Sequence, residues 1–387
     1  MSRSCPRPQL FLLVLLWACG APTPDGASRR PRATEATQES PVARTEAFGL
    51  PERGSESVAV RTRAPAPPEP VLPPPSMDDE PVPGFDVMSF RDGAGLPRPF
   101  IGLRRSQDAL IDGLRHLTPT GFRPVGSTST VFHMKLDGRY DAAFKSKTHD
   151  RPNGPAAEVA AYRLSRCLGL NNVPPAVSRR IPETALRAAF ENQPGHTWEE
   201  ISQRMVREHG DLVPGVAIYW IPKMVDLDID DPAGIARWTG WLTQGEMIQA
   251  GSRSLAAHIS TMVVFDYLIG NFDRFSGGNA RGDEAGTLVF LRDHDVAFAV
   301  RLGQRVHKRI LSRMLRAERF SASFYQALSE LTRACFLAEL ARDPAWRGGR
   351  LLSEARIDGV FERLETAKSH IESLIQLHGR DEVLAFP

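Results

Sequence analysis

Cysteine is scarce in this chain, and the few present do not form a disulfide-stapled framework. Only four of the 387 residues are cysteine, and Cys5 and Cys19 lie within the N-terminal leader described below. The remaining two, Cys167 and Cys335, are too few for such a framework. They could pair in an oxidising compartment, but each lies in an apolar helical pattern, where a buried free thiol is the commoner state. We therefore expect both to be unpaired.

Net charge is also nearly absent. The 48 lysine and arginine residues almost balance the 46 aspartate and glutamate residues, which gives a formal charge of +2. A whole-molecule basic field is therefore missing, and nucleic acid is not expected as a partner. Apolar residues at 42% and charged residues at 24% are typical of a globular protein with a substantial core, which excludes disorder throughout.

The N-terminus has the order of an export signal. Arg3 and Arg7 precede an unbroken apolar run, Leu10–Trp17, which is too short to cross a bilayer as a helix. The run leads into Ala-Cys, and the ending resembles a bacterial lipobox, in which the cysteine is lipidated. We expect residues 1–19 to be a signal peptide and Cys19 to anchor an exported lipoprotein on the periplasmic or cell-surface side of a membrane. An ordinary secretory signal cleaved nearby stays the alternative.

A proline-rich segment follows the leader. Between Gly20 and Pro99 the chain holds 16 of its 31 prolines and hardly any aromatic residue, so it cannot bury enough apolar surface to fold. Pro65–Pro75 favours an extended polyproline II spacer. We expect residues 20–95 to be a disordered tether and residues 96–387 to be one domain.

The first half of that domain mixes strand and helix signals. Val131–Leu136 alternates before Asp137-Gly138, a strong hairpin turn signal, and Ala142–Lys145 is the expected returning strand. Pro155 opens a helix, as proline at a first helical position does, and Val216–Trp220 is a further apolar strand.

The second half is predominantly helical, with one hairpin around Leu288–Leu291. Helices are expected over Leu255–Ile269, Lys308–Leu315, Ala322–Ala341 and Ile357–Leu377. The chain thus predicts an α+β fold with a β-rich N-lobe at about 100–224 and a helical C-lobe at about 225–387.

The order of charged residues fits phosphoryl transfer, which requires a cation on the phosphates, a metal-holding carboxylate and a base near the acceptor hydroxyl. Lys145 lies on a predicted strand, and Glu158 lies thirteen residues later in the first turn of the next helix. The carboxylate can pair with the ammonium and hold it extended. Taken alone, either residue would more simply be a solvated surface charge.

A second group follows the apolar helix that ends near Ile269. Asp273 lies where the helix gives way to a glycine-rich loop, a suitable position for a catalytic base. Asn279 can offer its carbonyl oxygen to Mg²⁺, although it is equally a turn residue after two glycines. Asp266, at the end of the helix, is expected to brace the loop through hydrogen bonds.

A third group follows a short apolar strand and reads Asp293-His294-Asp295. Asp293 is expected to hold metal against the phosphates, with Asp295 as its competitor, since residues two apart on a strand share a face. A metal hydrolase would need a second histidine cluster at ligand spacing, which the sequence lacks.

Together these segments resemble the secretory-pathway kinases of the four-jointed and Fam20 type, which are related to HipA-like and phosphatidylinositol kinases. The helix and turn after the nucleotide lysine, the catalytic loop and the metal-binding Asp motif each have a counterpart, and they occur in the right order over about 155 residues. The matching segments are Glu158–Leu164 with Gly169–Pro175, Asp266–Arg274, and Asp293-His294 with Ala297-Phe298.

The resemblance implies a bilobal protein-kinase-like fold and transfer of the γ-phosphoryl group of ATP, with Mg²⁺ or Mn²⁺, to a hydroxyl of a protein or glycan acceptor. It implies Lys145 and Glu158 as the nucleotide ion pair, Asp273 as the base, and Asp293 as a metal ligand with Asn279 as a candidate second. It further points to Gly126, Ser127, Thr128 and Ser129 as the phosphate-covering loop and to Val216–Met224 as the interlobe strand and hinge.

Two departures from the family pattern keep alternatives open. Phe275 stands where these kinases mostly carry histidine, and Asn279 falls six rather than five residues after the base. An exported pseudokinase that binds nucleotide or protein without turnover is one alternative. Nucleotidyl rather than phosphoryl transfer in the same pocket is another, because a fold does not fix a reaction.

Overall fold

The computed structural model describes residues 99–126, 130–137, 140–190, 198–346 and 351–387. The expected signal peptide, its Cys19 and the proline-rich tether lie outside these residues, as do Ser127–Ser129 of the phosphate loop and Gly138 of the hairpin turn. The domain boundary near residue 95 therefore stays a prediction. None of the helices described is both long and apolar enough to span a membrane.

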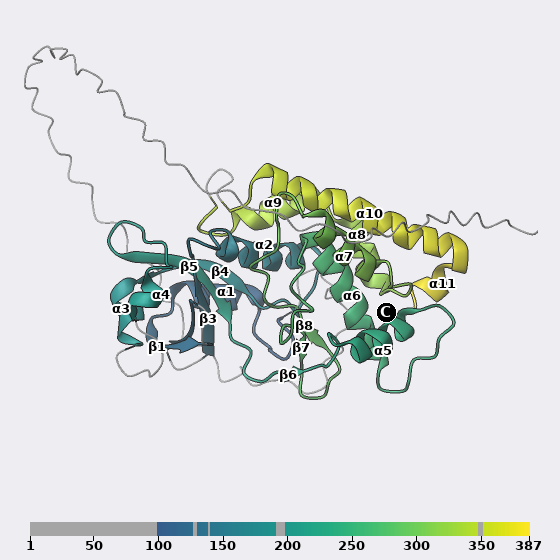
Figure 1. The fold of residues 1–387 in the computed structure, drawn as a ribbon, viewed down its shortest axis with the longest axis horizontal. Helices are drawn as coiled ribbons and strands as arrows, with labels where there is room; N and C mark the ends of the chain where they lie inside the picture. The colour runs from purple at the N-terminus through teal and green to yellow at the C-terminus, as the bar shows by residue number, and fades with distance from the viewer. Residues whose placement is uncertain (1–98, 127–129, 138–139, 191–197, 347–350) are drawn as a thin grey trace, which may run out of the picture. The chain divides into compact units, whose positions relative to one another are not determined.

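The first part of the described chain is built on a five-stranded antiparallel sheet (Figure 1), with strand order β1-β2-β3-β5-β4. The strands are β1 (Pro119–Val125), β2 (Val131–Leu136), β3 (Tyr140–Ser146), β4 (Ala176–Pro182) and β5 (Leu212–Tyr219). β2 and β3 pair directly, as the hairpin signal predicts. Phe132, Met134 and Phe144 are buried on one face of this hairpin, which leaves Ala143 and Lys145 on the other.

Helix α2 (Gly154–Cys167) connects this sheet to the helical part of the chain. It has proline in its first turn, as expected, and the glycine that follows its C-terminus has φ +68°. The helix is almost wholly buried, and it packs against β4, β5 and the later helix α9 (Arg333–Ala341). Glu158 is thereby carried on an element that is held from both sides. Three further helices belong to this half: α1 (Gln107–His116), α3 (Glu183–Ala188) and α4 (Trp198–Ser202).

Cys167 at the end of α2 forms a disulfide with Cys335 in α9, with 6.1 Å between their Cα atoms. The expectation that both thiols are free was wrong. Each cysteine does lie in an apolar helical pattern, but the packing of the two helices brings residues 168 positions apart within bridging distance. Nothing in the spacing of the two cysteines along the sequence reveals that proximity.

The second part of the chain is helical, as predicted, with a small three-stranded sheet of order β6-β7-β8. The strands are β6 (Val225–Asp226), β7 (Arg281–Gly282) and β8 (Val289–Phe290), and the remaining helices are α5 (Pro232–Leu242), α6 (Arg253–Ile269), α7 (Gln304–Met314), α8 (Ala322–Glu330), α10 (Glu354–His378) and α11 (Arg380–Val383). The single helix expected over 322–341 is two helices, α8 and α9, because Thr332 caps the second by accepting a hydrogen bond from the Cys335 amide.

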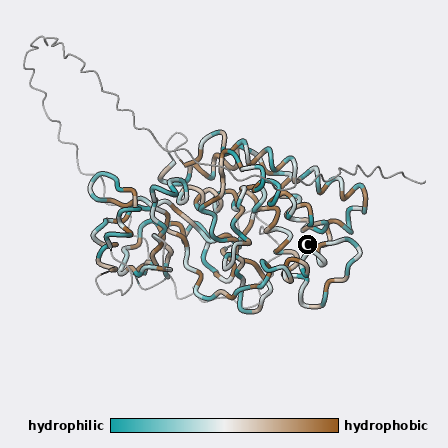
Figure 2. The backbone as a smooth tube through the Cα atoms, in the orientation of Figure 1, coloured by the Kyte–Doolittle hydropathy of each residue, from teal (hydrophilic) through white to brown (hydrophobic). Residues whose placement is uncertain are grey.

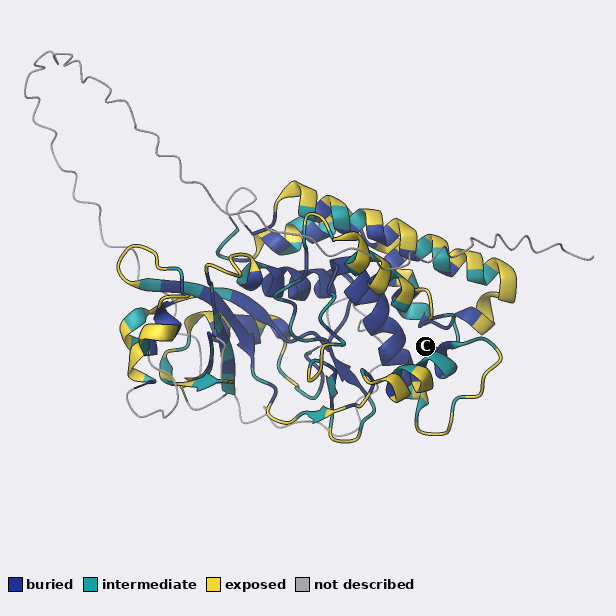
Figure 3. Cartoon of the chain, in the orientation of Figure 1, coloured by how far each residue is buried: buried dark blue, intermediate teal, exposed yellow. Residues whose placement is uncertain are grey.

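Helix α6 is the central element of this part. Every residue from Leu255 to Ile269 is buried, and Figure 3 shows the helix in the colour of buried residues for most of its length. In contrast, α10 alternates between hydrophilic and hydrophobic along its length (Figure 2) and buries only one face. Gly270 ends α6 with φ +70°, in the left-handed region where a glycine is favoured. The loop that carries Asp273 therefore starts from a fixed point in the core.

The disulfide should contribute to stability, because it closes a loop of 168 residues in the unfolded chain. We expect the double variant Cys167→Ser/Cys335→Ser to lose about 2–5 kcal/mol of the free energy of unfolding, measured by denaturant melts without reductant. Four thiols that react freely in the denatured full-length protein without reductant, rather than only those of Cys5 and Cys19, would contradict the bridge.

Candidate functional site

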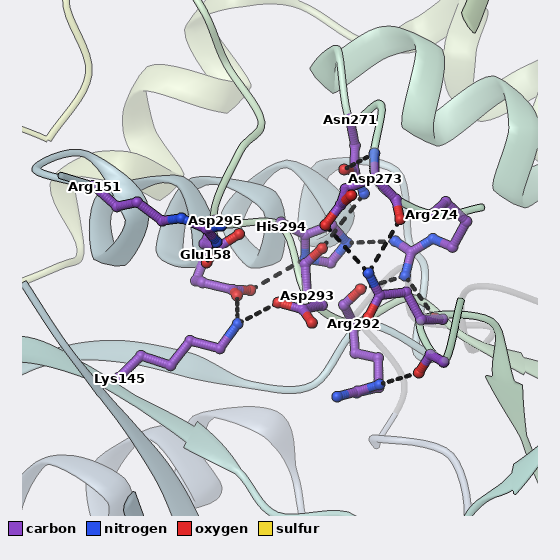
Figure 4. Close-up of polar contacts among 12 residues, drawn as sticks. Lys145, Arg151, Glu158, Asn271, Asp273, Arg274, Arg292, Asp293, His294 and Asp295 are labelled. Carbon is purple, nitrogen blue, oxygen red and sulfur yellow. Dashed lines mark hydrogen bonds and ion pairs between the residues drawn. The ribbon is translucent and has the colours of Figure 1, made fainter. Parts of the chain in front are cut away.

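Three charged side chains meet at the cleft between the sheet and the helical part (Figure 4). The Lys145 ammonium on β3 lies 2.5 Å from Glu158 Oε1 on α2 and 2.5 Å from Asp293 Oδ1, just after β8. The sequence-predicted pair of Lys145 and Glu158 is thus in contact, and Asp293 joins it from 148 residues away. Asp293 has φ +65°, a conformation uncommon outside glycine that is found at functional sites.

The electrostatics of the three groups hold all of them charged. Burial alone would lower the pKa of Lys145, but the carboxylates of Glu158 and Asp293 outweigh it, and the pKa lies above its ordinary value. Burial opposes ionisation of Glu158 and Asp293 as well. The Lys145 ammonium outweighs that burial, so the pKa of each carboxyl is held below its usual value.

The loop after α6 is braced by a buried ion pair. The Arg274 guanidinium donates from Nε to Asp266 Oδ2 at 2.9 Å and from Nη2 to Asp266 Oδ1 at 3.0 Å. It also donates to the backbone carbonyls of Asn279 and Arg292. Asn271 donates from Nδ2 to Asp266 Oδ1 at 3.1 Å. Asp266 therefore braces the loop, as the sequence predicted, and Arg274 ties that loop to the strand that leads to Asp293.

His294 continues this network toward the sheet. Its Nε2 lies 3.2 Å from Nη2 of Arg274, and its Nδ1 lies 3.3 Å from Glu158 Oε2. Because a guanidinium can only donate, Nε2 accepts and Nδ1 donates to Glu158. Sequence reasoning placed His294 and Arg274 in the motifs but gave neither a role; their adjacency to Asp293 and Asp273 was the only signal.

Asp273 lies in the loop after α6, partly exposed. Its backbone amide donates to Asn271 Oδ1 at 3.3 Å. The Asn279 amide group donates to the Asp273 carbonyl oxygen at 3.1 Å and reaches Asp273 Oδ2 at 3.4 Å. Asn279 thus faces the expected base, and its role as a metal ligand stays a prediction. Phe275, the departure from the family pattern, packs beside Trp238 and beneath the Arg313 guanidinium.

Asp295, the competitor for the metal role, is engaged elsewhere. It accepts a hydrogen bond from Arg151 Nη1 at 2.6 Å, and burial raises the pKa of its carboxyl. Figure 4 shows Asp295 and Arg151 on the side of Glu158 away from the Lys145–Asp293 contact. Of these two aspartates, Asp293 is therefore the one that directly contacts Lys145.

A cleft adjoins these charged groups. Its lining residues include the apolar side chains Val125, Val131, Ala143, Ile218, Ile221 and Met224, the rings of Tyr219 and Trp220, and the charged residues Lys145, Glu158, Arg292 and Asp293. The expected hinge segment supplies one wall. Gly126, the first residue of the expected phosphate loop, follows β1 with φ +75°, and Ser127 and Thr128 lie outside the described residues.

The carboxylates fit a metal that is shared with a nucleotide. The described residues hold no group of three or more His, Cys, Asp or Glu side chains placed for an all-protein site. Mg²⁺ and Mn²⁺ at nucleotide sites need only one or two carboxylates, because phosphates and water complete the shell. Asp293 is placed for this role, because it lines the cleft and contacts Lys145, the side chain that is expected to bind the phosphates.

Comparison with known proteins finds relatives among kinases. No family model matches the chain. Human glycosaminoglycan xylosylkinase is 26% identical over 270 residues, which are 61% of this chain and 63% of that protein. The chain therefore spans less than two thirds of this curated relative.

The solved structures show the fold. A Golgi casein kinase with Mn and ADP bound matches with a TM-score of 0.56 and 18% identity, over 74% of this chain and 80% of that one. Hydra Fam20 with sugar matches with a TM-score of 0.53 and 17% identity, over 74% and 94% of the two chains. The predicted α+β, kinase-like fold is confirmed, and that fold is similar to the fold of a Fam20-type kinase.

The Asp266–Arg274 pair should be a principal source of local stability. Asp266→Asn leaves a buried guanidinium without its counter-charge, and we expect a loss of about 3–5 kcal/mol in the free energy of unfolding. Denaturant melts measure it. The matched control is Glu354→Gln, which breaks an exposed pair with Arg333 and should cost at most about 1 kcal/mol. Equal losses in the two variants would contradict the bracing role.

Proposed function

We propose that this chain, a relative of the Fam20-type secretory kinases, is an ATP-dependent kinase that transfers the γ-phosphoryl group to a hydroxyl of a protein or glycan acceptor. The observation that supports the proposal most directly is the Lys145 ammonium held between Glu158 and Asp293 at 2.5 Å from each. This arrangement places a fixed positive charge and a carboxylate side by side at the end of an apolar cleft. A nucleotide with its base in the cleft would meet both groups with its phosphates.

The roles follow from what each side chain can do. Lys145 neutralises negative charge on the phosphates, and the Glu158 carboxylate holds the Lys145 ammonium in position. Asp293 would hold Mg²⁺ or Mn²⁺, which when bound neutralises charge on the β- and γ-phosphates. Asp273 accepts the proton of the acceptor hydroxyl, and Asn271 fixes the backbone of that loop. Phosphoryl transfer asks for positioning and charge rather than covalent catalysis, and the rigid support of these groups suits it.

The pseudokinase alternative rests on the two departures around the catalytic loop. Phe275 packs against Trp238 and Arg313 and so serves to hold the loop, a role that does not require histidine chemistry. Asn279 donates to Asp273 and orients it. Neither departure removes one of the four ionisable groups, which favours an active enzyme.

Turnover separates the two functions. With the full-length chain and Mg²⁺ or Mn²⁺, we expect metal-dependent formation of ADP from ATP, measured by a coupled assay. Asp273→Asn should lower kcat by about 10²–10⁴-fold with ADP affinity unchanged, whereas Asp293→Asn should weaken metal-dependent ADP binding as well. Asp226→Asn, an exposed residue paired with Arg281, is the control and should behave as wild type. Tight binding of ADP by a wild-type protein that shows no turnover would instead establish the pseudokinase.

We also propose that the protein is exported and anchored to a membrane through Cys19. The leader, the Ala18-Cys19 pair and the proline-rich segment support this, and the disulfide suits an oxidising compartment outside the cytoplasm.

The anchor is testable in a bacterial host. The wild-type chain should carry a lipid on Cys19 by mass spectrometry and should be released from membranes only by detergent. Cys19→Ala should lose the lipid. A wild-type chain recovered in a soluble, exported form that begins after Ala18 without lipid would contradict the anchor and favour an ordinary secretory signal.

A further inference from the structure

Arg292, immediately before Asp293, lies in the nucleotide cleft and forms no ion pair with a carboxylate of the described residues. It lines the cleft together with Lys145 and Trp220, and its side chain is half-buried. Its guanidinium donates from Nη1 to the Gly278 carbonyl at 3.3 Å (Figure 4). This residue took no part in the roles assigned above.

The other cations of the site are each paired with a carboxylate. Lys145 contacts Glu158 and Asp293, Arg274 contacts Asp266, and Arg151 contacts Asp295. Among the contacts of the described residues, Arg292 makes one long hydrogen bond to a neutral carbonyl and no ion pair. The nearby carboxylates of Asp293 and Glu158 attract this partly buried cation without forming an ion pair with it, so its five guanidinium donors meet no charged acceptor among the described residues. The arrangement is therefore suited to an anion that arrives with a ligand.

The position of Arg292 in the cleft indicates which part of a ligand would carry this anion. The apolar part of the cleft, with Ala143 and Ile218, suits a planar base, and Lys145 lies at its charged end on the sheet side. Arg292 comes from the opposite side, on the segment after β8 that carries Asp293. A nucleotide that fills the cleft would therefore pass its phosphates between Lys145 and Arg292.

We propose that Arg292 is a nucleotide-binding residue that contacts the phosphate chain from the helical side of the cleft, opposite Lys145. The inference rests on the proposed function, since it takes a nucleotide as the ligand. A contact with Arg292 would also help to balance the negative charge of a bound nucleotide. Two carboxylates already neutralise the Lys145 ammonium, and the Asn279 amide group is hydrogen-bonded to Asp273. A triphosphate carries more negative charge than one divalent cation neutralises, and Arg292 supplies a further positive charge that is fixed in the protein.

Binding measurements on the full-length chain test this without relying on turnover. The probes are ADP with Mn²⁺, adenosine, and inorganic tripolyphosphate, each titrated by calorimetry into wild type, Arg292→Gln and Arg292→Lys. We expect Arg292→Gln to weaken ADP and tripolyphosphate about 10- to 100-fold, as loss of a hydrogen-bonded charge does, and to leave adenosine unchanged. The affinity of Arg292→Lys for ADP and tripolyphosphate should lie between those of wild type and Arg292→Gln, because lysine keeps the positive charge but lacks the forked donors of a guanidinium.

The chain offers a matched control. Arg281 donates from Nε to the same Gly278 carbonyl, at 3.1 Å, but is paired with Asp226. Arg281→Gln should therefore leave the binding of all three probes unchanged, and its thermal melt provides a reference for the effect of losing that shared hydrogen bond.

Each outcome bears on the proposal. Equal weakening of adenosine and ADP by Arg292→Gln would show that Arg292 only shapes the pocket, and unchanged binding of every probe would overturn the contact. Unchanged ADP binding with a raised KM for an acceptor would assign the anion to the acceptor and also overturn it. Arg292-dependent binding of tripolyphosphate by a chain that shows no turnover would uphold this inference while the kinase proposal failed. A wild type that binds neither ADP nor tripolyphosphate would overturn both.

Discussion

One continuous chain of hydrogen bonds and ion pairs holds the site together. It runs from Asp266 through Arg274 and His294 to Glu158, and from there through Lys145 to Asp293. Its members come from the central helix α6, the loop after it, helix α2, strand β3 and the segment after β8. Because most of these groups are buried, leaving any one of them unpaired is costly, and the network holds five separate segments in a single arrangement.

The packing around this network explains why it can be rigid. Helix α6 is buried on all sides and ends at Gly270, so the loop after it begins from a fixed point. Helix α2 is packed between the sheet and α9, and the Cys167–Cys335 disulfide joins its far end to α9. Glu158 and Asp273 are thus both carried by elements with little freedom. A reaction that depends on positioning and charge needs this kind of support.

Local sequence patterns predicted what is local in the structure. The strand, turn and helix signals placed Lys145 and Glu158 thirteen residues apart at the right separation for contact, and the end of α6 marked the catalytic loop. Contacts over long sequence distances were beyond such patterns. The position of Asp293 after a short apolar strand suggested a metal ligand, and the family resemblance supported that role, but no pattern predicted its contact with Lys145. The partnership of Cys167 with Cys335 was missed. The break between α8 and α9 was missed because Thr332, the capping residue, lies within an otherwise continuous apolar pattern. The roles of His294 and Arg292 follow only from their contacts in the folded structure, which local sequence patterns do not predict.

In the proposed function, this network serves phosphoryl transfer from ATP. The most direct measurement incubates the full-length chain with candidate secreted proteins and glycans and with ATP labelled at either the γ- or the α-phosphate, in the presence of Mn²⁺ or Mg²⁺. We expect that only the γ-label becomes covalently attached to an acceptor or to the chain itself, and that chelation of the metal abolishes this labelling. Attachment of the α-label would show nucleotidyl rather than phosphoryl transfer. The absence of any transfer by a folded protein that binds ATP would show that the chain is not a kinase.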